Sequence, residues 1–73
     1  MTEKIIIETM ANEFKTENLY QAMRKNGQVN EEVARQVLSD ISSRIYGMKE
    51  VADALGFDGD AIAKKAIELA MAK

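Results

Sequence analysis

The sequence contains no cysteine and no histidine. Disulfides, thiolate nucleophiles, imidazole general bases and the usual zinc ligands are therefore excluded. No glycine-rich loop is placed to cradle a phosphate, and the adjacent carboxylates Glu31 and Glu32 diverge if they lie on a helix. We therefore expect a protein that is not an enzyme and that holds no metal and no cofactor.

Proline is also absent, and aromatic residues are limited to two Phe and two Tyr. The lack of proline suits helices joined by short glycine-containing turns. A hydrophobic content of 47% with 30% charged residues is typical of a globular rather than a disordered chain. We expect residues 1–73 to form a single helical domain, near the small end of what folds alone.

Long apolar runs and a large charge of one sign are missing as well. No stretch approaches the ~20 apolar residues of a membrane span, and no signal-peptide pattern opens the chain. We therefore expect a cytoplasmic protein without a membrane partner. The net charge of −2 gives no overall attraction to nucleic acid. A core this small supplies only ~3–5 kcal/mol of net stability, which favours self-association.

Residues 30–46 carry the clearest helical pattern. One apolar stripe recurs there at helical spacing, formed by Ala34, Val37, Leu38, Ile41 and Ile45. Asn30 precedes it as a good N-cap, because its side-chain oxygen can accept a hydrogen bond from the first turn. Gly47 follows it, where a left-handed C-cap is expected. We predict a helix that ends at Gly47 and whose stripe forms the centre of the core.

The N-terminal segment shows a second stripe, in which Ile6, Met10 and Phe14 step by four. Three consecutive β-branched residues at 5–7 would also suit a short strand, but no second strand is evident to pair with it. We predict a helix here, with Thr2 as its N-cap. Because no partner for this stripe is identifiable within the chain, we expect Ile6, Met10 and Phe14 to form a homodimer interface.

The apolar phase changes at residues 15–18, which predicts a turn or kink and a separate helix over residues 17–25. Thr16 can cap that helix, and Asn26-Gly27 is a strong stop signal. Beyond Gly47, a short helix over residues 48–55 and a last helix to about Met71 follow. We therefore expect an all-α fold, a compact bundle of four or five short helices.

Residues 48–67 have the spacing of a tight helical corner. Ala52 is small where two helices approach, Gly56 takes the turn and Ile62 anchors the second helix. The stretch Met48–Ile67 resembles the helix-turn-helix motif of phage-repressor-like DNA-binding proteins. The resemblance covers about a quarter of the chain and implies that residues 58–67 lie in the DNA major groove. It places Lys49, Lys64 and Lys65 near phosphates, and Asp60, Ala61 and Ala63 near base edges.

The charges of this corner disfavour DNA, because Asp58 and Asp60 stand at the front of the recognition helix and would face phosphate repulsion. The alternative is that the same corner serves only as a scaffold. We favour a non-enzymatic protein-interaction or regulatory module whose partner is a protein or a second copy of the chain. A helix-turn-helix DNA-binding regulator remains the alternative.

Two further motifs lack residues that their functions require. Residues 55–59, Leu-Gly-Phe-Asp-Gly, resemble the L-G-x-D-S motif of acyl carrier proteins, but Gly59 stands where the phosphopantetheine-bearing serine is required. The Asp58-Gly59-Asp60 segment does not make a calcium loop, because the twelfth position would be Leu69 instead of a bidentate Glu.

Overall fold

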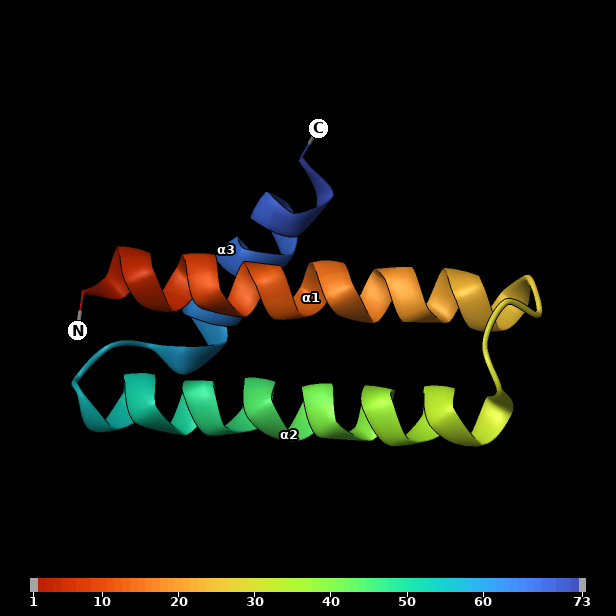
Figure 1. The fold of residues 1–73 in the computed structure, drawn as a ribbon. Helices are drawn as coiled ribbons and strands as arrows, with labels where there is room; N and C mark the ends of the chain where they lie inside the picture. Colours follow the sequence, from red (N-terminus) through yellow and green to blue (C-terminus); the bar gives the residue numbers. More distant parts are fainter. Residues whose placement is uncertain (1, 73) are drawn as a thin grey trace.

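The structure is a computed structural model that describes residues 2–72. This range contains three α-helices and no strand: α1 (Glu3–Lys25), α2 (Glu31–Ala54) and α3 (Gly59–Met71). α1 and α2 lie antiparallel and side by side, and α3 crosses behind α1 at a steep angle (Figure 1). The predicted all-α class is confirmed, but three helices replace the expected four or five short ones.

α1 is one unbroken helix. Thr2 caps it as predicted, because its Oγ1 accepts a hydrogen bond from the Ile5 amide at 3.3 Å. Residues 5–7 are helical, which confirms the helical interpretation over the strand. The predicted turn at residues 15–18 is wrong, and Thr16 lies inside the helix, where its hydroxyl donates to the Asn12 carbonyl at 3.1 Å.

The change of apolar phase along α1 has a tertiary cause. α3 is short and crosses only the N-terminal half of α1 (Figure 1). That half is buried by both of the other helices. α3 still borders α1 at Glu17 and Asn18, and the last turns of α1 lie beside α2. The buried side of the helix therefore shifts along its length without any break in the backbone.

α2 joins two predicted helices into one. It continues through Gly47 to Ala54, so the expected end at Gly47 is wrong. The glycines with positive φ are Gly27 at 71° and Gly56 at 89°, and they follow the ends of α1 and α2 as predicted. A glycine inside a helix costs only about 1 kcal/mol. Ile45 and Ala52 are buried on either side of Gly47, so packing carries the helix through it.

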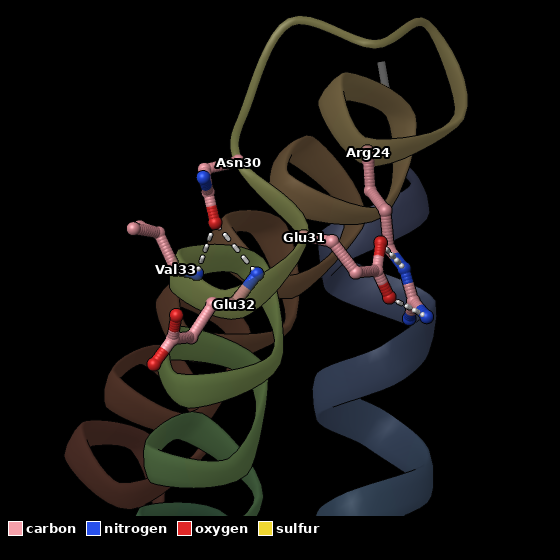
Figure 2. Close-up of polar contacts among 5 residues, drawn as sticks. All are labelled: Arg24, Asn30, Glu31, Glu32 and Val33. Carbon is pink, nitrogen blue, oxygen red and sulfur yellow. Dashed lines mark hydrogen bonds and ion pairs between the residues drawn. The ribbon is translucent and has the colours of Figure 1, made fainter.

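The turn between α1 and α2 is fixed by polar contacts at its two ends (Figure 2). Asn30 caps α2 as predicted, since its Oδ1 accepts from the Glu32 amide at 2.8 Å and from the Val33 amide at 3.4 Å. Arg24 Nε donates to Glu31 Oε2 at 2.9 Å. This pair joins the last turn of α1 to the first turn of α2, with each charge at the helix end that its dipole favours.

The core lies where the three helices meet. Its buried side chains come from all of them: Ile6, Met10, Ala11, Ile41, Ile45, Ala52, Ile62 and Ala66. Val37 packs against this cluster and Leu38 is half-buried, so the α2 stripe contributes to the core as expected.

The N-terminal stripe does have partners within the chain. Ile6 and Met10 are 3% and 0% exposed, and Phe14 packs partly buried against the same cluster. The expectation that this stripe lacks an intramolecular partner is therefore wrong. A homodimer interface through Ile6 and Met10 would require the monomer core to open.

Candidate functional site

The C-terminal corner joins α2 to α3 through a short turn. Gly56 adopts a φ of 89°, and the Phe57 amide donates to the Ala52 carbonyl at 2.9 Å. Asp58 Oδ1 accepts from the amides of Asp60 and Ala61 at 3.1 and 3.2 Å, which caps α3. Ala52 and Ile62 are buried at the corner, in the packing roles that the sequence predicts for them.

Gly59 determines how closely the two helices of the corner approach. Its amide donates to Asp53 Oδ1 at 2.7 Å. A Cβ at this position would lie 2.7 Å from the Lys49 carbonyl oxygen and 2.8 Å from Asp53 Oδ1, closer than real contacts allow. From the sequence alone, Gly59 was considered only within the two rejected motifs. The signal missed was a glycine directly after the Asp58 cap, at the first position of a helix.

The basic residues expected at DNA phosphates are largely engaged by carboxylates. Lys49 Nζ lies 2.7 Å from Asp60 Oδ1, and Lys65 Nζ lies 3.4 Å from Glu3 Oε1 on α1. The hydrogen bond to Asp60, and then its Coulomb attraction, raise the pKa of Lys49, and the same two effects of Lys49 lower the pKa of Asp60. Lys64 is exposed.

The residues expected near base edges differ in their exposure to solvent. Asp60 and Ala61 are exposed at the start of α3, whereas Ala63 is partly buried against the core. The structure thus brings Lys49 and Asp60 together as an ion pair and ties Lys65 to α1.

A second region, which the sequence did not indicate, lies between α1 and α2. It is an open hollow of about 390 Å³ with an almost wholly apolar surface, lined by Ile6, Thr9, Arg44, Gly47, Met48 and Val51. We call this the apolar hollow. A Cβ on Gly47 would meet no atom within 4 Å, so the missing side chain helps to leave the space open.

The polar edge of the apolar hollow is held by an ion pair. Arg44 Nη2 lies 3.1 Å from Glu13 Oε2, and Arg44 Nε donates to the same oxygen at 3.1 Å. This contact joins α2 to α1 beside the hollow and neutralises the guanidinium locally. The rest of the hollow offers mainly apolar contact.

The chain leaves many large apolar side chains in solvent. Those at least 42% exposed are Ile5, Leu19, Val33, Tyr46, Val51, Leu55, Ile67, Leu69 and Met71. Val51 lines the hollow, Leu55 lies one turn further along α2, and Ile5 lies one turn before Thr9 on α1. Because α1 and α2 are antiparallel, Ile5 and Leu55 lie at the same end of the helix pair as the hollow. Scattered apolar residues are ordinary, whereas a contiguous patch indicates an interaction surface.

Comparison with protein-family models, with curated proteins and with solved structures finds no match. Within residues 2–72, acidic side chains form no cluster of three or more that could hold a metal ion. No helix in the same range has the length and apolar character needed to cross a membrane.

Proposed function

We propose that this chain is a non-enzymatic protein-interaction module whose binding surface is the apolar hollow with its neighbours Ile5 and Leu55. The observation that carries the proposal is an apolar hollow flanked by half-exposed aliphatic side chains on two long helices. A surface of this kind accepts the apolar side of another helix, as in helix-in-groove recognition.

DNA binding through the C-terminal corner has less support from the same structure. Two of the three lysines that would contact phosphates are paired with carboxylates, Lys49 with Asp60 and Lys65 with Glu3. Each phosphate contact adds about −0.9 to the log–log salt slope. With Lys64 alone outside these pairs, the corner would gain little from counterion release, and Asp58 and Asp60 would repel the backbone.

The proposal is tested by site-specific photo-crosslinking in cells that express the full chain. A photoreactive amino acid at position 51 is expected to give a protein adduct, because Val51 lines the hollow. The matched control carries the same group at Leu69, an exposed aliphatic position on α3, and is expected to give little. Failure to form an adduct at position 51 would contradict the proposal.

The DNA alternative has its own measurement. Labelled duplex DNA is titrated with the chain at low salt, and we expect no salt-sensitive binding. Micromolar binding that weakens steeply with salt, and that Lys64→Glu with Lys65→Glu abolishes, would replace the protein-interaction proposal with a DNA-binding one.

A further inference from the structure

We infer that the apolar hollow is occupied by a second copy of this chain, in a two-fold symmetric dimer in which Val51 of each copy enters the hollow of the other. The inference rests on the proposed function, because it names the partner of the same surface. It differs from the dimer expected through Ile6, Met10 and Phe14, since Ile6 and Met10 are buried and the monomer core stays closed.

The exposed area of the monomer is the first argument. The chain has an accessible surface of 5096 Å², whereas a folded monomer of 8.1 kDa typically exposes about 4,500 Å². The excess of roughly 600 Å² is what each partner contributes to a small specific interface, which buries about 1,200 Å² in total. A second copy of this chain brings the same excess, so the two requirements match.

The shape of the molecule explains the excess. Its extents are 41 × 26 × 16 Å, which is flat for a small domain. α3 covers one side of the α1–α2 pair (Figure 1). The apolar hollow is lined by α1 and α2 without any residue of α3. Joining two copies through their apolar hollows would place a second layer of helices on the uncovered apolar surface. The resulting dimer would be more compact than the monomer.

Self-complementarity is the second argument. Gly47 and Val51 lie one turn apart on the same side of α2. Gly47 leaves open space in the hollow, and Val51 presents a half-exposed aliphatic side chain. If two α2 helices pack antiparallel about a two-fold axis between these positions, each Val51 faces Gly47 of the other copy. An isologous interface requires this reciprocity, in which residue i contacts j and j contacts i.

The charges beside the hollow are compatible with self-pairing. Arg44 is neutralised by Glu13 of its own chain, so two uncompensated guanidinium groups do not meet across the axis. The exposed apolar side chains on α3 offer no comparable fit, because Ile67 and Leu69 border separate hollows against α1 whose linings are more polar. The first includes Glu17 and Asn18, and the second includes Glu3, Lys4 and Glu8.

Analytical ultracentrifugation of the pure chain tests the inference. We expect a reversible monomer–dimer equilibrium between about 10 and about 500 µM, as suits an interface at the small end of the specific range. Val51→Asp is expected to weaken the dimer at least tenfold. Leu69→Asp makes the same chemical change at similar exposure on α3, and it should leave the dimer constant within about twofold. Helical circular dichroism checks that both variants remain folded.

Gly47→Gln provides a test in which fold and dimer respond in opposite directions. Glutamine is a far better helix former than glycine and meets open space at this position, so the monomer should become more resistant to urea. The same side chain fills the hollow with a polar group, so the dimer should weaken at least tenfold. A dimer that persists unchanged in this variant would overturn the inference.

The outcomes separate this inference from the proposed function. A pure chain that stays monomeric at 500 µM overturns the second-copy inference, while a position-51 adduct with another protein still supports the interaction module. If the dimer and every position-51 adduct are absent, both fail. An adduct with twice the mass of the chain, together with loss of the dimer in Val51→Asp, supports both.

Discussion

The Lys49 ammonium lies 2.7 Å from the Asp60 carboxylate, and this ion pair spans the corner from the end of α2 to the start of α3. The two residues were expected to contact different parts of a DNA duplex, a phosphate and a base edge. Their engagement with each other instead ties two helices together and places a negative charge beside one of the positive charges of the corner. The corner therefore has a structural explanation that requires no ligand.

The first prediction concerns the pH response of this pair. Attraction to Asp60 raises the pKa of Lys49 above 10.5, and attraction to Lys49 lowers the pKa of Asp60 below 3.8. The lysine contribution to stability is complete below 10.5 and is lost as pH rises through the folded pKa. The aspartate contribution is complete above 3.8 and is lost as pH falls through its folded pKa.

Lys49→Met should therefore return the pKa of Asp60 toward 3.8, measured by NMR titration of the side-chain carboxyl. Lys64→Met is the matched control and should leave that pKa unchanged, because Lys64 has no ion pair with Asp60 in the structure. An Asp60 pKa that is equal in the parent and in Lys49→Met would show that the pair does not form in solution.

The second prediction compares two helical glycines that differ in their surroundings. Gly47→Ala should raise the free energy of unfolding by about 1 kcal/mol, because alanine is the better helix former and the added Cβ meets nothing. Gly59→Ala should lower it by about 1–3 kcal/mol, as overpacking does. Its Cβ would lie 2.7 Å from the Lys49 carbonyl oxygen, which is backbone and cannot move aside cheaply. Urea denaturation at low protein concentration measures both, and changes of equal sign would refute this account.

The third prediction tests the core. Ile41 is fully buried, so Ile41→Asp should abolish folding by placing an unpaired charge among apolar side chains. Tyr46 is 64% exposed on the same helix, and Tyr46→Asp should leave the helical far-UV circular dichroism spectrum and its cooperative melt in place. If Ile41→Asp melts like the parent, the position assigned to the α2 stripe is incorrect.

The fourth prediction ranks two contacts at the α1–α2 turn (Figure 2). Asn30→Ala should cost about 1 kcal/mol of unfolding free energy, because two amides of the first turn lose their acceptor. Arg24→Ala should cost about 0.5 kcal/mol or less, since the Arg24–Glu31 pair is about half-exposed. Gln28→Ala, an exposed position in the same turn, serves as the control in thermal melts. A larger loss from Arg24→Ala than from Asn30→Ala would reverse this ranking.

Helix ends were predictable from the sequence because their determinants are local. Thr2, Asn30 and Asp58 each accept hydrogen bonds from amides two or three residues further along. Gly27 and Gly56 take the positive φ that follows a helix. Such contacts depend on chemistry within one turn, so a reading of neighbouring residues finds them.

Two predicted helix boundaries were wrong, the turn at residues 15–18 and the end at Gly47. At both places, contacts with residues distant in the sequence decide whether the helix continues. A phase change at residues 15–18 and a glycine at position 47 resemble breaks when the helix is considered alone. In the folded chain, the crossing of α3 over half of α1 accounts for the first, and burial of Ile45 and Ala52 carries α2 through the second. Tertiary packing overrides a local cost of about 1 kcal/mol.

The sequence by itself determined that the chain is helical, where its main apolar stripes lie, and that Thr2 and Asn30 cap α1 and α2. Only the tertiary structure decided which of those apolar residues are covered. Ile6 and Met10, expected at a dimer interface, are buried, whereas Val51 and Leu55 are about half exposed. The physical reason is that periodicity fixes the direction of a side chain from its own helix axis. Whether another helix lies in that direction depends on where the short α3 crosses the longer pair.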